Sequence, residues 1–342
     1  MRGDRVASMN PLRRSARILV VAPNWIGDAL MAQPLLARLH ERQPQARIDV
    51  LAPAWVAPVV RRMPEVAGVI ESSLEHGRLA LRERWRLGRT LNALGYDQAI
   101  VLPNTWKSAL VPYFADIGIR SGYVGESRYG LLNVLYRRQP GREPMASHYA
   151  RLAETPGAEL KLPLREPRLM ADTQAIRRAR ERFGLPARYA ALCPGAEYGP
   201  AKRWPHFKEL AERLALPVVL LGSQKEREQC ATIKGRNLAG ETTLDEAIDL
   251  LAGAQYIVTN DSGLMHVAAA LGRPQVALFG SSSPQHTPPL SGKARVLWLG
   301  IECSPCYARE CPLGHFRCMQ DLTVARVLEK LGSDPIFREN GV

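Results

Sequence analysis

Short β-branched segments alternate with amphipathic helical segments along the chain, and this alternation runs through two separate series. In the first series, strands are expected at five segments: Arg17–Ala22, Arg47–Ala52, Val66–Glu71, Gln98–Leu102 and Ser121–Val124. Helices are expected between them, for example over Gln33–Arg42 and Leu79–Leu94. Strands that alternate with helices form parallel sheets covered by helices. The alternation weakens between Glu126 and Leu162.

A Pro-rich passage at residues 162–167 is typical of a linker, and the alternation restarts after it. A helix over Thr173–Phe183 is expected to end at Gly184, a common C-terminal cap. Five strands are then expected: Tyr189–Cys193, Pro217–Leu221, Tyr256–Thr259, Gln275–Phe279 and Ala294–Leu297. Open α/β sheets bind ligands at the carboxyl ends of their strands, so two such halves predict a central cleft. We therefore divide the chain into an extension (1–16), a first domain (17–165) and a second domain (166–342).

The 342 residues carry a large excess of positive charge. Lys and Arg number 46 against 33 Asp and Glu, for a formal charge of +13. Such a charge favours polyanionic partners. Because no helix-turn-helix or RNA-binding motif is present, nucleic acid is not an expected partner, and a phosphate- or carboxylate-rich substrate at a membrane surface is favoured. A solvated basic surface without such a partner is the alternative.

The sequence contains no membrane-spanning candidate. No stretch reaches the roughly 18–20 uninterrupted apolar residues that a transmembrane helix requires. The basic N-terminal residues are not followed by an apolar core and a cleavage site, so no secretory signal is expected. The sequence therefore favours a cytoplasmic protein.

The first candidate site follows the first strand. The strand from Ile18 ends in a turn, and Gly27 and Asp28 then open a helix at the sheet edge that faces the cleft. Asp28 has two interpretations, a helix cap or a catalytic carboxylate. The turn lacks the G-x-G-x-x-G fingerprint of dinucleotide-binding proteins.

Two further segments lie at strand ends of the second series. The loop from Cys193 to Pro205 carries Lys202 and could bring an ammonium group to a diphosphate, or be an ordinary loop with an exposed lysine. After Asn260, a capped helix begins with Gly263 in its first turn, which costs about 1 kcal/mol relative to alanine. A ligand close to this helix start would account for that cost, and the partial positive charge there suits phosphate. His266 is either a site residue or a core histidine.

Four cysteines form a C-x2-C-x4-C-x6-C array at Cys303, Cys306, Cys311 and Cys318, with His315 inside it. In a cytosolic protein this density indicates thiolate ligation of a structural zinc rather than disulfides. The alternative is a set of reduced thiols that hold a loop against the cleft.

Together these segments resemble the heptosyltransferases of lipopolysaccharide core biosynthesis, glycosyltransferase family 9. The matching passages are Asn24–Asp28, Pro194–Pro205, Asn260–Leu271, Phe279–Ser291 and Cys303–Met319. The resemblance implies the GT-B architecture, two Rossmann-like domains that face a central cleft. It also implies inverting transfer of L-glycero-D-manno-heptose from ADP-heptose onto the first heptose of a lipid A–Kdo–heptose acceptor, at the inner face of the inner membrane.

The same resemblance implies roles for individual residues. Asp28 corresponds to the general base, and Lys202 to a contact with the donor phosphates. Asn24 and Lys107 correspond to the acceptor side. The remaining donor contacts are expected among Asp261, Ser262, Gly263, Leu264, His266, Glu197, Glu226, and Thr242 or Thr243.

A route without a metal cofactor is expected, because the chain has no Asp-x-Asp triplet, whereas Lys202 and a helix start can carry phosphate charge. Three alternatives stay open. The chain could be a related heptosyltransferase or other ADP-sugar transferase that acts on a different core acceptor. It could instead be a non-catalytic nucleotide- or polyanion-binding protein, or carry a zinc-held interaction module in its cysteine array.

Overall fold

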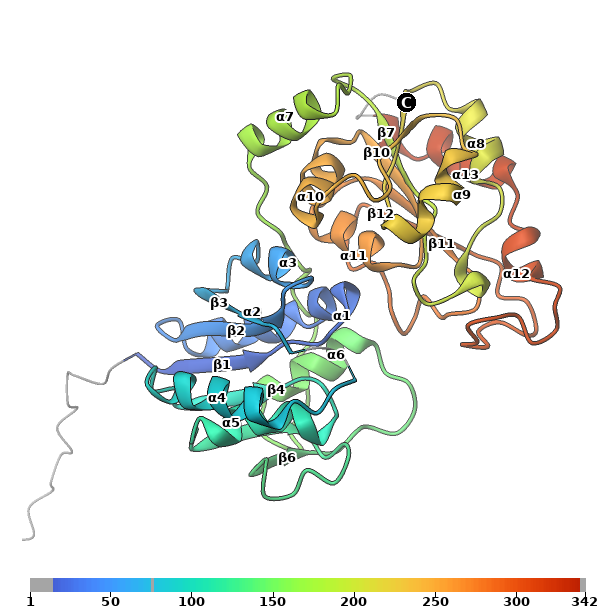
Figure 1. Cartoon of the computed structure of the whole chain (residues 1–342). Coiled ribbons are helices and arrows are strands. Elements are labelled where there is room, and N and C mark those ends of the chain that lie inside the picture. The colour runs from blue at the N-terminus through green and yellow to red at the C-terminus, as the bar shows by residue number, and fades with distance from the viewer. Residues whose placement is uncertain (1–14, 75–76, 339–342) are drawn as a thin grey trace, which may run out of the picture.

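The computed structural model describes residues 15–74 and 77–338 and contains two six-stranded sheets (Figure 1). The first sheet comprises β1 (Arg17–Val21), β2 (Arg47–Pro53), β3 (Gly68–Ser72), β4 (Gln98–Val101), β5 (Ile119–Tyr123) and β6 (Val134–Tyr136). The second comprises β7 (Ala190–Cys193), β8 (Val218–Leu220), β9 (Arg236–Asn237), β10 (Tyr256–Asn260), β11 (Gln275–Phe279) and β12 (Ala294–Trp298). The expected extension lies outside the described residues except for its last two positions.

Both sheets are parallel and doubly wound. The strand orders are β3-β2-β1-β4-β5-β6 and β12-β11-β10-β7-β8-β9. In each order the chain starts near the middle of the sheet, runs to one edge and then returns to fill the other side. The expected α/β class is thereby confirmed. The domain boundary at residue 165 remains a proposal.

Helices cover both faces of each sheet. The first half contains α1 (Ile26–Met31), α2 (Gln33–Arg42), α3 (Ala57–Arg61), α4 (Leu81–Asn92), η1 (Trp106–Ala109), α5 (Leu110–Phe114), α6 (Met145–Ala150) and η2 (Arg151–Ala153). The second half contains α7 (Thr173–Arg182), η3 (Pro200–Lys202), α8 (Phe207–Arg213), η4 (Gln224–Glu226), α9 (Arg227–Ala231), α10 (Leu244–Gly253), α11 (Gly263–Ala270), α12 (Arg317–Gln320), α13 (Val324–Ser333) and α14 (Pro335–Arg338). Within the part of the chain that the structure describes, no helix is both long and apolar enough to span a bilayer.

The two faces of the first sheet have different neighbours, as β1 illustrates. Ile18 and Val20 point into a core that continues through α1 and α2 into the second half. Leu19 and Val21 point the other way, into a separate core beneath α4 and α5. Because strand side chains alternate between faces, one apolar run supplies both cores. Only the first of these faces is turned toward the second half.

A buried ion-pair cluster joins the halves at α3 and α10. The guanidinium group of Arg62 lies 2.5 Å from Asp249 and 3.1 Å from Asp245, both on α10. Asp249 is 8% exposed and Asp245 is half exposed. The backbone carbonyl of Arg62 also accepts a hydrogen bond from Met170, in the segment that connects the halves. The cluster therefore fixes the orientation of one half against the other.

We expect Arg62→Ala to lower the free energy of unfolding by about 2 kcal/mol, because it leaves the buried Asp249 carboxylate without its cation. Arg61→Ala is the matched control, since Arg61 pairs with Glu71 and both side chains are 47% exposed. Its cost should stay below about 0.5 kcal/mol. Urea unfolding measures both values. Equal losses of unfolding free energy in the two variants would contradict the assignment of Arg62 to a buried ion pair between the halves.

Candidate active site

The two halves meet where α1 packs against α11, and two glycines permit the close approach. A Cβ atom on Gly27 would lie 2.8 Å from Cδ2 of His266, and one on Gly263 would lie 3.3 Å from Cβ of Ile26. Both distances are shorter than an ordinary carbon–carbon contact. The close approach of Ile26 therefore gives a packing reason for a glycine at position 263, in addition to the ligand expected from the sequence.

His266 fills the space between α11 and the start of α1. The side chain is buried, and this burial lowers its pKa to about 4. The imidazole is therefore neutral at neutral pH. These observations agree with the interpretation of His266 as a core histidine that packs against Gly27 of α1.

Asp28 is the third residue of α1, whose N-cap is Trp25, so its carboxylate does not cap the helix. Burial raises the pKa of Asp28 to about 6, against the opposing effect of the nearby ammonium group of Lys202. Burial, followed by the charge of Asp28, in turn raises the pKa of the Tyr149 phenol. A carboxylate whose pKa lies close to neutral pH is suited to general base catalysis.

An ion pair between Lys202 and Asp261 joins the loop after β7 to the end of β10 in the second sheet. Nζ of Lys202 lies 2.5 Å from Oδ2 of Asp261, and the hydroxyl of Ser282 donates a hydrogen bond to the same oxygen. The side-chain amide of Asn260 donates to the carbonyl of Pro194 at 2.7 Å and ties the Lys202 loop to β10. Asp28 and Lys202 come from different halves, and they lie near enough for the charge of Lys202 to lower the pKa of Asp28.

A cavity of about 530 Å³ opens beside the start of α11, within the size range of small-molecule sites. Most of the residues expected to contact a donor line it: Glu197, Glu226, Thr242, Thr243, Ser262, Gly263 and Leu264. Lys202, Asp261 and His266 are not among its described lining residues. The first half closes the cavity with Ile26 and Trp55.

A second cavity, of about 230 Å³, lies at the carboxyl edge of the first sheet. Asn24 and Lys107, the two residues expected on the acceptor side, both line it. Arg84 lines it as well, and its buried guanidinium donates to the carbonyl of Lys107 at 3.0 Å. The indole of Trp55 donates to the carbonyl of Asn24 at 2.9 Å. The segment therefore reaches from the smaller cavity at Asn24 to the larger one at Ile26, and Asp28, two residues further on, is not among the described lining residues of either.

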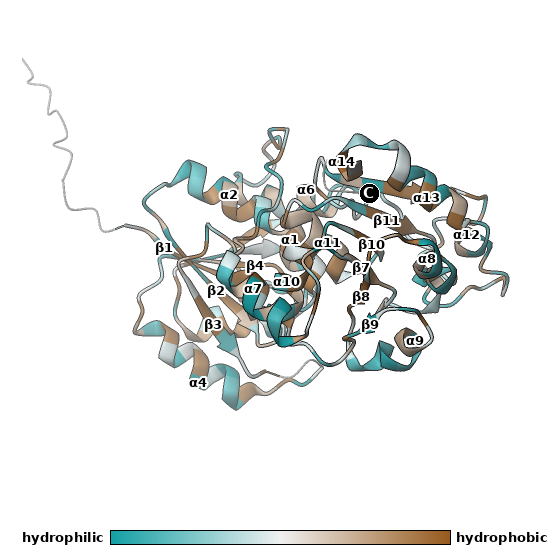
Figure 2. Cartoon of the chain, turned by 90° about the horizontal axis from the view of Figure 1, so that it is seen from above, coloured by the Kyte–Doolittle hydropathy of each residue, from teal (hydrophilic) through white to brown (hydrophobic). Residues whose placement is uncertain are grey.

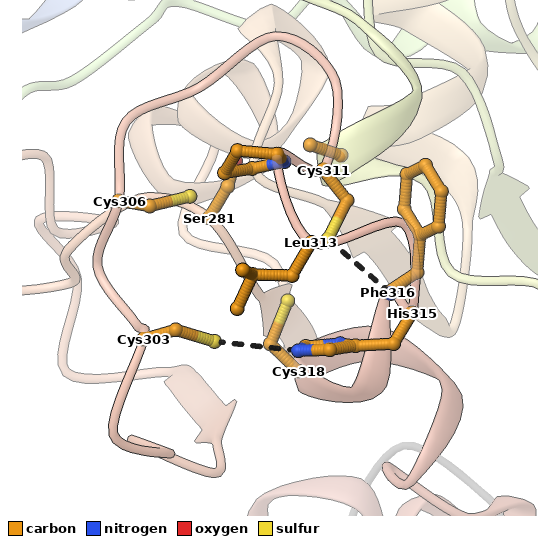
Figure 3. Close-up of a pocket in the computed structure, with 10 residues that line it drawn as sticks. Ser281, Cys303, Cys306, Cys311, Leu313, His315, Phe316 and Cys318 are labelled. Atoms are coloured by element: carbon orange, nitrogen blue, oxygen red, sulfur yellow. Dashed lines mark hydrogen bonds between the residues drawn. The ribbon is translucent and has the colours of Figure 1, made fainter.

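The cysteine array corrects one expectation. Cys303, Cys306, Cys311 and Cys318 gather around a small cavity of about 20 Å³ with His315 (Figure 3). Over residues 15–74 and 77–338, no group of three or more His, Cys, Asp and Glu side chains is arranged to hold a metal ion. Apolar residues, Pro312, Leu313 and Phe316, line the same small space. The prediction of a structural zinc is therefore wrong for this structure, and all four cysteines are free thiols.

The cysteine-rich segment supports the Lys202 loop instead. The backbone of Ala201 donates to the carbonyl of Arg309 at 3.0 Å, and the phenol of Tyr198 donates to the carbonyl of Tyr307 at 2.5 Å. A Cβ atom on Gly199 would lie 2.4 Å from the Arg309 carbonyl oxygen. These contacts agree with the alternative reading of the array, a loop held against the cleft.

Comparison with known proteins identifies the family. The family model described as Glycosyltransferase family 9 (heptosyltransferase) matches residues 84–317. The chain belongs to this glycosyltransferase family. It is 46% identical to lipopolysaccharide heptosyltransferase 2 of Escherichia coli over 93% of this chain and 98% of that protein. It is 41% identical to lipooligosaccharide heptosyltransferase 2 of Haemophilus influenzae, over 92% and 98%.

A solved structure, that of the E. coli ADP-heptose lipopolysaccharide heptosyltransferase II, matches this glycosyltransferase with a TM-score of 0.84 and 44% identity. The match covers 95% of this chain and all of that one. The likeness confirms the GT-B architecture. Open α/β sheets bind ligands at the carboxyl ends of their strands, and both cavities lie at such edges.

The sequence of this glycosyltransferase did not predict two residues of the candidate site. Trp55 follows the end of β2 and lines the larger cavity, a position that the strand-end rule alone could have indicated. Tyr149 lies on α6, in the passage where the strand–helix pattern weakens, and no local signal places it beside Asp28. Only the packing of α6 against α1 and α2 does so.

Proposed function

We propose that this glycosyltransferase moves L-glycero-D-manno-heptose from ADP-heptose onto the first heptose of a lipid A–Kdo–heptose acceptor, with inversion. The observation that carries the proposal is that Asn24 and Ile26 line the two cavities while Asp28, next along α1, lies near enough to Lys202 for the ammonium charge to lower its pKa. The named relatives, lipopolysaccharide heptosyltransferases 2, support this substrate pair.

In the proposed reaction, the first domain (17–165) binds the acceptor and the second (166–342) binds the donor. Asp28 takes the proton of the acceptor hydroxyl as its oxygen attacks the anomeric carbon. The bond between that carbon and the diphosphate oxygen breaks, and ADP leaves with the electron pair. Lys202 and the backbone N–H groups at the start of α11 stabilise the developing negative charge.

Because the proposed acceptor is a lipid, we infer that the protein is cytoplasmic and works at the inner face of the inner membrane.

The residues that would hold the donor are Glu197, Glu226 and Thr242 around the nucleotide, together with Ser262, Gly263 and Leu264 at the start of α11. Glu226 is buried, and its carboxylate accepts from the backbone of Ser223 at 2.7 Å, which fixes its orientation in the cavity.

The test is incubation with ADP-heptose and a mono-heptosylated acceptor, followed by mass spectrometry. We expect a product heavier by one heptose and release of one ADP. Transfer to a heptose-free acceptor alone would favour a related heptosyltransferase. ADP binding without any product would favour a non-catalytic nucleotide-binding protein.

The pH dependence of kcat/KM should report the ionisation of Asp28. The base must be deprotonated, and its pKa is about 6, so kcat/KM should fall about tenfold per pH unit below pH 6 and level off above it. His266, with a pKa of about 4, is neutral throughout this range. Initial rates between pH 5 and pH 8 measure the profile. A plateau that continues down to pH 5 would argue against Asp28 as the base.

A further inference from the structure

The outward face of α4 combines exposed apolar and basic side chains. Leu81 and Trp85 are 50% and 52% exposed, and they lie four residues apart on one side of the helix. Arg82, Arg86 and Arg89 are exposed next to them. No ion pair with a described residue engages these three arginines. Figure 2 shows α4 at the outer rim of the first half, with hydrophilic and hydrophobic bands side by side.

The inner face of α4 fixes this orientation. Gly88 and Leu91 are buried against α5, and a Cβ atom on Gly88 would lie 2.5 Å from Cβ of Phe114. Arg84 is buried on the same side and donates to the carbonyl of Leu79 at 2.6 Å. The helix cannot rotate about its axis without losing these contacts. Trp85 and the three arginines Arg82, Arg86 and Arg89 therefore stay turned to solvent.

The neighbourhood of α4 links this face to the acceptor cavity. Arg84 of α4 and Val111 of α5 line that cavity. Trp106, next to the acceptor-side Lys107, is 41% exposed, and Tyr113 of α5 is 46% exposed. The helices α4 and α5 cover the sheet face that is turned away from the second half. A surface that meets the α4–α5 side of the first half therefore lies beside the cavity that holds the acceptor-side residues.

We propose that the α4 face, consisting of Leu81, Arg82, Trp85, Arg86 and Arg89, docks on an anionic lipid bilayer. The inference rests on the proposed function, because a lipid-anchored acceptor must reach the first half from a membrane. Exposed tryptophan and leucine beside arginine is the composition of helices that lie in the membrane interface. Arginines attract anionic headgroups, and their apolar stems remain along the interface.

The test is flotation of the full chain with vesicles at low ionic strength, where charge attraction is least screened. Vesicles of phosphatidylethanolamine and phosphatidylglycerol should bind the protein, and vesicles of phosphatidylcholine should bind it much less. Each arginine near an anionic surface adds roughly a factor of five to the affinity, so Arg82→Gln/Arg86→Gln/Arg89→Gln should lower it about 100-fold. Trp85→Ala should lower it roughly tenfold.

The matched control neutralises three arginines on α7, Arg177→Gln/Arg178→Gln/Arg182→Gln, whose side chains are 69%, 65% and 61% exposed. This control should bind vesicles within about twofold of the unchanged protein, apart from a small effect of net charge. An equal loss in both triple variants, or equal binding to both kinds of vesicle, would overturn the docking proposal.

A deacylated, water-soluble acceptor separates docking from transfer. On it, the α4 triple variant should turn over within about twofold of the unchanged protein, because the substituted residues lie outside both cavities. A triple variant that loses turnover on this acceptor as well would show α4 to be part of the site, against the proposal. If the unchanged protein transfers nothing while only the α4 variant loses vesicle binding, docking stands and the proposed function fails.

Discussion

Asp28→Asn should lower turnover of ADP-heptose and acceptor about a thousandfold, the contribution expected of a positioned general base. Donor affinity, measured as ADP binding by calorimetry, should stay within about twofold, because the carboxylate is not needed to hold the nucleotide. The substitution keeps the shape of the side chain and removes only its basicity. Near-normal turnover with normal ADP affinity would remove Asp28 from the mechanism.

The same variant should be more stable than the unchanged protein at neutral pH. Burial raises the pKa of Asp28 from 3.8 to about 6, so the folded state holds a proton that the unfolded state releases between these values. Ionising the carboxylate in the folded state then costs up to about 3 kcal/mol above pH 6 and nothing below pH 3.8. Thermal unfolding at pH 7.5 and at pH 3.5 should show the gain only at the higher pH.

Lys202→Met has the second large expected effect, on both binding and turnover. Loss of the ammonium group should weaken ADP binding at least tenfold and lower turnover about a hundredfold, because the departing diphosphate loses a cation. It should also lower the free energy of unfolding by about 3 kcal/mol, because Asp261, 5% exposed, keeps its charge without a partner. Calorimetry, initial rates and urea unfolding measure the three effects.

Two controls separate these effects. Lys202→Met/Asp261→Asn removes the buried charge as well, and should restore most of the stability while turnover stays low. Lys225→Met removes a lysine that pairs with Glu197 at 2.6 Å but is 71% exposed, and should leave the free energy of unfolding nearly unchanged. Unchanged ADP affinity in Lys202→Met would contradict the role of Lys202 at the phosphates.

The sequence predicted the interior of both sheets well, because central parallel strands are continuous apolar runs. Gln275–Phe279 and the helix Gln33–Arg42 were predicted with the bounds that the structure has. The two strands that were missed, β6 and β9, both lie at sheet edges, with three and two residues. The other two edge strands, β3 and β12, have five residues each and were predicted, whereas two or three residues are too few to show an apolar run or an alternating pattern.

The candidate site was predictable where it depends on strand ends. Asp28, Lys202 and Asp261 each follow a strand, and parallel strands present their carboxyl ends at one edge. The contacts between halves were not predictable in this way. The approach of Ile26 to Gly263 and the ion cluster at Arg62 depend on how the two sheets dock, which no local pattern encodes. The cysteine spacing likewise does not reveal how the four thiols are arranged around their small cavity.

The most direct test of the central claim is a crystal structure with ADP and a non-transferable analogue of ADP-heptose. We predict that the diphosphate lies at the start of α11 within hydrogen-bond distance of Lys202, and that the anomeric carbon faces Asp28. A nucleotide bound away from α11, or a sugar separated from Asp28 by protein, would contradict the proposal that base and phosphate site serve one reaction.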